Sequence, residues 1–484
     1  QASPSIDDSM DYHGYYVKEA ALSASVPVIE WFIADADYAD MHANHVGDKV
    51  YLPCVVVVGN DVFDNSLVRI KGEYSLTFPK KGYKIKLPSG YSFAVNGGSG
   101  RQLKEFHLNS NQASEGVGRT TVAWHAAEVA GFKIPDVLPI RMNKNGAFEG
   151  LYIFSDKYES EWRQANGYNN GPLYEDTSDI ISGATDFNDI NAWNQTMKLD
   201  RKDPLLKEAV LDTNNIPNMF NIMSLMALVN DHDHALANNT LQYKSNQTER
   251  WETLPWDMDL LFQNENFMIS PMDGPSYFWS QDKAPYIAIY EEKDLRSLYY
   301  RRLRSLVDQL YSNNDLLNLY HATNVAHNIE IQLDNAKWPS SPSIYRSPMA
   351  DDEYQIKHQK YAFLAHHRQP WALPPAQTDA DRQSVSLAEV VTDSNDANEY
   401  IRLYNTANTP VDLSNWTIEG INYTIPAGSV IPANGSLYLL RDDIGYRASH
   451  AAVLVAGQYS NDLGSNGSLT LKTDTGATID MENY

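Results

Sequence analysis

The sequence predicts an α+β domain followed by a smaller all-β domain. Up to about residue 375, strand-like alternation is interspersed with longer helical stretches, and beyond residue 384 short strands alternate with turns. The length of 484 residues is too great for one hydrophobic core. We therefore divide the chain into an N-terminal arm at residues 1–25, a main domain at 26–375, a polar linker at 376–383 and a β-sandwich domain at 384–484.

The composition is that of a globular protein that does not bind nucleic acid. Hydrophobic residues make up 43% and charged residues 21% of the chain, and the formal net charge is −24. Because phosphate backbones require clustered lysine and arginine, this charge argues against a nucleic-acid partner. No stretch is long and apolar enough to predict a transmembrane segment. The acidic composition and the 30 tyrosines beside only 38 lysines and arginines lead us to expect an extracellular or cell-surface protein.

The main domain begins with strands. We expect them at residues 28–33, 49–59 and 66–78, where apolar and β-branched residues are separated by turn signals. The second segment contains Cys54, the only cysteine, so no intramolecular disulfide is possible and we expect a buried thiol.

The next strand is cationic on one face. Residues 80–87 alternate lysine with apolar residues, and four lysines lie within seven positions. Two interpretations remain open. The segment is either a solvated edge strand, whose lysines prevent aggregation, or a strand that faces a phosphate group.

Helices and one hairpin follow in the middle of the main domain. We expect a helix at residues 115–130 that ends at Gly131, and another that starts within 156–163. The hairpin comprises residues 139–142 and 150–154, around an Asn-Gly turn.

The later part of the main domain is predicted to be helical. Residues 164–215 are polar, and we expect loops and short helices there. Residues 295–311 form an amphipathic helix and 352–368 a further helix. Four arginines lie largely off the apolar stripe of the first of these, and we expect a solvated face from Arg296, Arg301, Arg302 and Arg304.

The stretch with the clearest chemical content begins with an apolar run at residues 219–230. A helix that is apolar on every face is a buried helix. Polar residues follow it in three groups: Asp231, His232, Asp233 and His234, then Asn238 and Asn239, then Asp257 and Asp259 after a short strand. Carboxylate and carboxamide oxygens are ligands that Mg²⁺ prefers, and a phosphate can complete its shell. The spacing from Asp233 to Asn238 is also that of a protein-kinase catalytic loop, but by itself it equally suits a polar loop after a helix. The sequence Pro-Trp-Asp-Met-Asp at residues 255–259, behind a core helix, leads us to predict a metal–phosphate site.

The same stretch also contains residues suited to a different chemistry. His232 and His234 could serve a His/Asp metallohydrolase. However, alternate residues on a helix do not face each other, and the motif H-E-x-x-H does not occur. We therefore favour the metal–phosphate interpretation.

The main domain resembles the CotH kinase family over roughly residues 50–370. The resemblance is carried, in the family's order, by residues 68–72 with 80–86, 108–111 with 118–119, 146–156, and 230–243 with 255–259. It implies an atypical protein-kinase-like fold that binds ATP with Mg²⁺ or Mn²⁺. It also implies a protein substrate, phosphorylated on serine or threonine outside the cell or on a coat.

The resemblance also assigns roles to individual residues. It makes Asp233 the catalytic aspartate. If Asn239 is the equivalent of the family's asparagine, the loop from Asp233 is one residue longer than in the family, which leaves Asp231 as a rival. The implied metal ligands are Asn238 or Asn239, Asp257 and Asp259. The implied cofactor-binding residues are Arg69, Lys84, Lys86 and Asp156, of which Asp156 stands where the family has a glutamate that pairs with a lysine.

Departures from the family pattern keep a second function open. Lys71, Glu73 and Asp156 each differ from the residue that is usual in the family. The alternative is a catalytically inactive CotH-like protein with a structural or surface-assembly role.

Residues 384–484 resemble the lamin-tail domain. The resemblance rests on residues 388–391, 399–405, 411–416 and 431–435. It implies an immunoglobulin-like sandwich that binds a surface or filament assembly partner and has no catalytic residues. We expect this domain to fold alone, with Leu403 and Trp416 in its core.

Overall fold

The structure is a computed structural model that describes most of the chain. The described residues are 24–72, 74–156, 158, 160–168, 171–175, 179–200, 202–231, 239–259, 261–262, 284–340, 346–365 and 373–484. Of the predicted N-terminal arm, only residues 24 and 25 are therefore described. The chain forms two compact units, and each is described by itself. The first comprises residues 1–124, 133–169 and 317–354, and the second comprises 125–132, 170–316 and 355–484.

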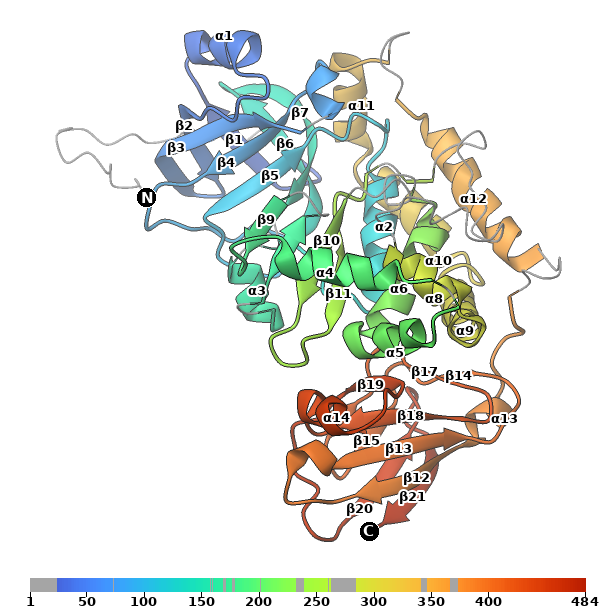
Figure 1. Ribbon diagram of the computed structural model, residues 1–484. Coiled ribbons are helices and arrows are strands. Elements are labelled where there is room, and N and C mark those ends of the chain that lie inside the picture. The colour runs from blue at the N-terminus through green and yellow to red at the C-terminus, as the bar shows by residue number, and fades with distance from the viewer. Residues whose placement is uncertain are drawn as a thin grey trace. The chain divides into compact units, whose positions relative to one another are not determined.

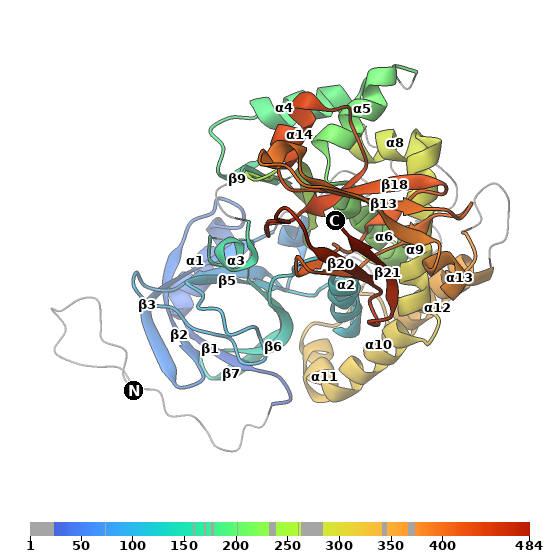
Figure 2. The ribbon, with the colours of Figure 1, turned by 90° about the horizontal axis from the view of Figure 1, so that it is seen from below.

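The first unit is built around a closed barrel (Figures 1 and 2). Its strands are β1 (Val28–Phe32), β2 (Leu52–Val58), β3 (Asp61–Lys71), β4 (Gly82–Lys86), β5 (Glu105–Asn109), β6 (Val137–Lys144) and β7 (Ala147–Ser155). They follow the order β1-β2-β3-β4-β5-β7-β6, and β1 closes the barrel by parallel pairing with β6. Apolar and aromatic side chains fill the interior, among them Trp31, Tyr83 and Phe154. Cys54 is buried in this core, as expected.

The predicted hairpin of the barrel is confirmed. β6 and β7 pair in antiparallel fashion around the turn. Asn145 and Gly146 have φ angles of 50° and 81°, which is the left-handed conformation that a tight hairpin turn requires. The hairpin is longer than predicted at both ends.

Short helices complete the first unit. They are α1 (Asp35–Asn44), the 3₁₀-helix η1 (Tyr74–Thr77), α3 (Ser160–Asn166), α11 (Asn328–Lys337) and parts of α2 (Gly118–Val129), α10 (Asp315–Ala326) and α12 (Met349–Ala365). α2 and α12 confirm the two helices predicted near residues 115–130 and 352–368.

A buried charge network fixes α11 to the barrel. Lys80 is completely buried, and its Nζ lies 2.6 Å from Asp334 Oδ1 and donates to the carbonyl of Leu151 at 2.6 Å. Arg346 donates to the other carboxylate oxygen of Asp334 at 3.0 Å. Burial lowers the pKa of Lys80 to about 8, while the Asp334 charge opposes that shift. Such buried charges are tolerated because each one has its partner.

The second unit combines helices with a small sheet. The helices include α4 (Asn188–Met197), α5 (Pro204–Thr213), α6 (Ile216–Val229), α8 (Ala284–Glu291) and α9 (Lys293–Leu310). The sheet has the order β11-β10-β8-β9, from β8 (Leu173–Glu175), β9 (Asp179–Ser182), β10 (Thr240–Lys244) and β11 (Trp251–Pro255). Strands β8 and β9 were not predicted, because they lie in a polar stretch where we expected mostly loops and short helices.

Helix α6 is the buried helix that the apolar run predicts. All of its residues except Asn218 are buried. It begins where the side chain of Asn215 accepts a hydrogen bond from the Asn218 N–H, with Pro217 in the first turn. It ends at Asn230, whose φ of 46° is left-handed, as at many helix C-termini.

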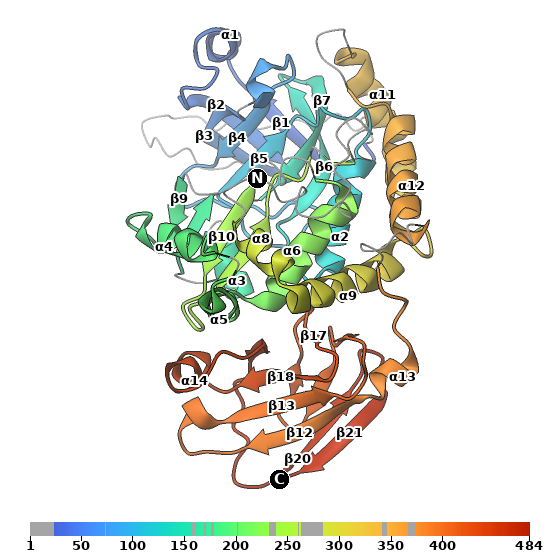
Figure 3. The same cartoon turned by 45° about the vertical axis from the view of Figure 1, so that its right-hand side comes forward.

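The arginines of α9 correct the expectation of a solvated face. Arg301 and Arg302 are 3% and 1% exposed, and Arg302 contacts four protein groups. α9 packs against α6 and also against β14 and β17 of the C-terminal domain, so polar side chains that neighbour the leucine stripe are covered as well (Figure 3 labels α6, α9 and β17).

The C-terminal domain is all-β apart from short helical turns. Its sheets have the orders β12-β13-β18-β19, β14-β17 and β16-β15-β20-β21. The strands are β12 (Val385–Val391), β13 (Tyr400–Asn405), β14 (Val411–Asp412), β15 (Thr417–Glu419), β16 (Tyr423–Thr424), β17 (Val430–Ile431), β18 (Gly435–Leu440), β19 (Val455–Gln458), β20 (Ser468–Lys472) and β21 (Thr478–Asn483). The turns are α13 (Asp379–Arg382), η5 (Asp396–Asn398) and α14 (Asp443–Ser449). Leu403 and Trp416 lie in its core, as predicted.

Candidate functional site

The candidate site lies in the second unit, around the C-terminal end of α6. Asp231 directly follows the helix, is buried, and donates its backbone N–H to the carbonyl of Met226 at 3.1 Å. Thr240 pairs with Pro255 in the β10–β11 hairpin, which places Asn239 and Asp257 at the same end of that hairpin. The chain then returns to α6, because the N–H of Phe262 donates to the carbonyl of Val229 at 2.9 Å. Asp257 and Asp259 therefore lie on a loop between the hairpin end and the helix end.

The backbone at this site is unusual. Asn239 and Asp257 have φ angles of 60° and 49°, in the left-handed region that asparagine and aspartate tolerate better than most residues. The N–H of Asp259 donates to the carbonyl of Asp257 at 2.9 Å, so a tight turn joins the two aspartates. Backbone conformations of this kind cluster at functional sites.

The donor set fits a hard divalent cation. Asp257 and Asp259 carry carboxylates and Asn239 a carboxamide, all of them oxygen donors. Within the described residues, no group of three or more histidines, cysteines, aspartates and glutamates is arranged to hold a metal ion. Four residues of the predicted site, His232, Asp233, His234 and Asn238, lie outside the described residues, and their assignments remain predictions.

The cationic strand is β4 of the first unit. It pairs with β3 on one side and β5 on the other, so the interpretation as an edge strand is wrong. Tyr83 and Ile85 point into the barrel core, and Lys84 and Lys86 therefore lie on the opposite face. A closed barrel leaves no edge to protect at this position.

Arg69 shares this face with the two lysines. It pairs with Lys84 across β3 and β4, and its guanidinium lies 5.5 Å from the ring centre of Tyr51. The ammonium of Lys86 lies 4.9 Å from the same ring. The three predicted phosphate-binding residues are thus neighbours.

Glu105 on β5 is the acidic partner of the lysines. Lys84 forms an ion pair with Glu105 Oε1, and Lys86 Nζ lies 3.6 Å from Oε2. Sequence reasoning did not identify Glu105. The one available signal was its position at the start of the strand Glu105–Asn109, which would pair with the lysine strand.

Asp156 lies at the end of β7 and contacts an arginine. Its Oδ2 accepts a hydrogen bond from Arg101 Nε at 3.0 Å, and its Oδ1 accepts one from the Asp136 N–H at 2.5 Å. Burial raises the pKa of Asp156 to about 7, although the Arg101 charge acts in the opposite direction.

These features define a kinase-like protein with an appended β-sandwich. One unit is a barrel with a lysine–glutamate ion pair, and the other carries carboxylates at the end of a buried helix. The chain belongs to the CotH kinase protein family, whose model matches residues 68–361. The Lamin Tail Domain model matches residues 378–484. Both resemblances drawn from the sequence are confirmed.

Comparisons with solved structures and with curated proteins add little to the family assignment. The chain is similar to the crystal structure of the Helicobacter pylori proinflammatory kinase CtkA, with 11% sequence identity over 58% of this chain and 90% of that chain, at a TM-score of 0.23. No curated protein sequence matches the chain. None of the helices in the described ranges is both long and apolar enough to cross a membrane.

Proposed function

We propose that the protein is a secreted or surface-associated kinase that transfers the γ-phosphate of ATP to serine or threonine residues of extracellular proteins. Family membership supports a kinase-like protein that uses ATP and a divalent metal. The observation that carries the proposal is the arrangement of Asp231, Asn239, Asp257 and Asp259 around the end of α6 and of the β10–β11 hairpin.

The second unit supplies the metal ligands and the catalytic aspartate in this proposal. Asp257 and Asp259, with Asn239 or Asn238, would hold Mg²⁺ or Mn²⁺. A bound divalent cation neutralises the charge that develops on the phosphate oxygens. Asp233, or its rival Asp231, accepts a hydrogen bond from the substrate hydroxyl and orients it for attack. Most of the acceleration comes from positioning and from fixed charges.

The first unit supplies cations for the nucleotide phosphates. Lys84 or Lys86, together with Arg69, would offset the negative charge of ATP. In protein kinases an ion pair between a lysine and a glutamate is required for this purpose. The ion pair of Lys84 with Glu105 supports the same role here.

A second candidate is a catalytically inactive CotH-like protein that serves in surface assembly through its lamin-tail domain. One observation favours it. Asp156, where the family has a glutamate that pairs with a lysine, forms its ion pair with Arg101.

The two candidates are separated by nucleotide binding and transfer. The thermal unfolding midpoint of the full chain is measured with ATP and with Mg²⁺, Mn²⁺ or a chelator, and radiolabelled ATP then tests transfer to proteins rich in exposed serine and threonine. A midpoint raised only when both nucleotide and metal are present, followed by label transfer, is the expected result. If neither metal gives a shift with ATP, the kinase proposal fails and the assembly role replaces it.

A further inference from the structure

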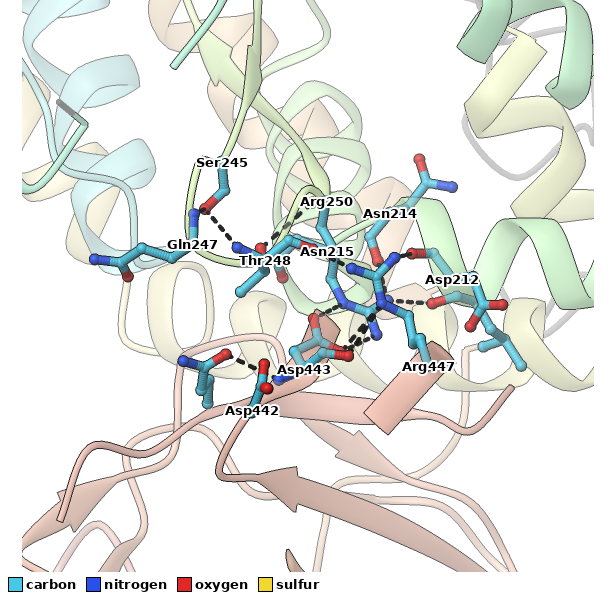
Figure 4. Close-up of polar contacts among 12 residues, drawn as sticks. Asp212, Asn214, Asn215, Ser245, Gln247, Thr248, Arg250, Asp442, Asp443 and Arg447 are labelled. Atoms are coloured by element: carbon cyan, nitrogen blue, oxygen red, sulfur yellow. Dashed lines mark hydrogen bonds and ion pairs between the residues drawn. The ribbon is translucent and has the colours of Figure 1, made fainter. Parts of the chain in front are cut away.

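The lamin-tail domain contacts the two elements that lead to the candidate site, helix α6 and the β10–β11 hairpin. Both the domain and these elements belong to the second compact unit. The contacts are made by two buried arginines, Arg302 on α9 and Arg250, which directly precedes the hairpin strand β11 and is shown in Figure 4.

Arg302 joins helix α6 to the lamin-tail domain. Its Nε donates to Asn221 Oδ1 of α6 at 2.7 Å. Its Nη1 lies 3.2 Å from Asp412 Oδ2 and donates to Ser414 Oγ at 3.0 Å, both in the lamin-tail domain. Its Nη2 donates to the carbonyl of Ala130, just after α2, at 2.9 Å.

The backbones approach closely beside this arginine. Asn221 Nδ2 donates to the carbonyl of Ala427 in the lamin-tail domain at 2.8 Å. The neighbouring Gly428 has a φ of 89°, and a Cβ atom there would overlap the carbonyl oxygen of Pro217 in α6. The contact therefore depends on a residue without a side chain.

Arg250 joins the β10–β11 hairpin to the same domain. Its guanidinium forms a two-pronged ion pair with Asp443 of α14, with Nη2 at 2.8 Å from Oδ1 (Figure 4). Arg447 of α14 donates to the carbonyl of Asp212 at 2.7 Å and to that of Thr248 in the hairpin turn. α14 thus holds the turn of the hairpin, and the predicted metal ligands lie at the hairpin's other end.

We propose that the lamin-tail domain is a positioning element of the kinase site, which acts through Arg302 on α6 and through Arg250 on the β10–β11 hairpin. This proposal rests on the proposed function, because the residues that it says are positioned are the candidate kinase-site residues. Helix α6 is hydrogen-bonded at Asn221 and leads to Asp231. The hairpin is held by polar contacts at its turn, and its other end leads to Asn239 and Asp257. The face of the domain that bears Asp412, Gly428 and α14 is then occupied within the chain. An assembly partner would have to bind elsewhere on the domain.

The coupling between the lamin-tail domain and the two elements is strong because both arginines are buried. Arg302 is 1% exposed and Arg250 is 5% exposed. A buried guanidinium that loses its carboxylate is left without compensation, so the elements around it loosen or shift to readmit water. A surface ion pair has no comparable effect, because water replaces the lost partner.

Hydrogen–deuterium exchange on the full chain tests the coupling. The variants are Asp412→Ala, Asp443→Ala and the milder Arg447→Ala, and the matched control is Glu389→Ala, which removes the surface ion pair with Arg402 inside the same domain. We expect roughly tenfold or faster exchange in residues 216–229 and 240–255 in the first two variants, because a buried charge has lost its partner. Arg447→Ala should accelerate hydrogen–deuterium exchange in residues 240–255 alone. The control should exchange at the wild-type rate in both segments.

A conservative variant separates positioning from general destabilisation. Asp443→Glu keeps the carboxylate and should restore both the exchange rates and the metal-dependent binding of ATP that Asp443→Ala weakens. Faster exchange confined to residues 384–484, or wild-type exchange at 216–229 and 240–255 in all three variants, would overturn the proposal. If Asp412→Ala or Asp443→Ala does not fold, Arg447→Ala decides the question alone. If the wild type binds no ATP, the proposed function fails, whereas the exchange comparison still decides the coupling.

Discussion

Asp257 combines a left-handed backbone with a carboxylate, so its charge can be tested without disturbing its conformation. Asparagine adopts φ angles near 49° at least as readily as aspartate, and Asp257→Asn therefore removes only the charge. We expect this variant to lose metal-dependent ATP binding by roughly tenfold or more, because one anionic oxygen leaves the cation's shell. Titration with ATP at several Mg²⁺ concentrations measures the loss.

Asp233 should fail in a different way from Asp257. A residue that orients the attacking hydroxyl acts in the transition state, so Asp233→Asn should keep ATP binding and lose transfer by about 10²-fold or more. Asp231→Asn is examined in the same single-turnover assay, since the loop length leaves the two aspartates as rivals. If transfer survives in both variants while the wild type is active, the catalytic assignment is wrong.

The buried carboxyl of Asp156 should make stability depend on pH. Its pKa is raised to about 7 in the folded protein, so the unfolded chain releases this proton at lower pH than the folded chain does. The contribution of Asp156 to the free energy of unfolding therefore falls as pH rises from about 4 to about 7. Urea unfolding measures the free energy of unfolding of the wild type and of Asp156→Asn at pH 5 and pH 8. Between these pH values the wild type should lose about 2–3 kcal/mol relative to the variant. An equal difference at both pH values would show that the carboxyl titrates normally.

At the scale of the element, β4 shows how far sequence periodicity reaches. Alternation of lysine with apolar residues correctly predicted a strand with one cationic face. It could not show that both edges of the strand are paired or that Glu105 lies opposite the lysines, because these facts depend on strands distant in sequence. Helix α6 was predictable for the opposite reason, since an apolar run on every face needs no knowledge of its neighbours.

The lysines of β4 give a prediction for the whole strand. If they bind nucleotide phosphates, Lys84→Met or Lys86→Met should weaken ATP binding about tenfold to a hundredfold, as expected for a lost charge-assisted hydrogen bond. The matched control is Lys104→Met, because Lys104 forms an exposed ion pair with Glu161 at 2.6 Å and lies just outside β5. Isothermal titration with ATP and Mg²⁺ compares the three. Equal affinities in both single variants and in the double variant would assign β4 a structural role.

At the scale of the whole molecule, the arginines of α9 mark the limit of what sequence could predict. Arg302 lies four residues after Leu298 and four before Leu306, so helical periodicity places it beside the leucine stripe, whereas its charge led us to expect a solvated position. The structure buries it instead, because a second domain some hundred residues later in the chain covers that position. The lamin-tail resemblance predicted the domain itself, and its β-sandwich core was predictable from short alternating strands. Its attachment to the helices was not predictable, since the polar residues involved, such as Asp412 and Asp443, look like ordinary turn residues.

The lamin-tail domain should nevertheless fold when separated from the rest of the chain. Its core is built from its own residues, with Leu403 and Trp416 at the centre, and the contacts described for Asp412 and Asp443 are polar ones that water can replace after separation. We expect residues 377–484 to give a β-type circular dichroism spectrum, resistance to proteolysis and one cooperative urea transition. Trp416→Ala should lower the free energy of unfolding by about 3–5 kcal/mol, because a large buried side chain is lost. Arg402→Ala, at an exposed ion pair with Glu389, should change it by less than about 1 kcal/mol. A fragment that is digested rapidly and shows no cooperative transition would mean that the domain depends on α6 and α9 for its fold.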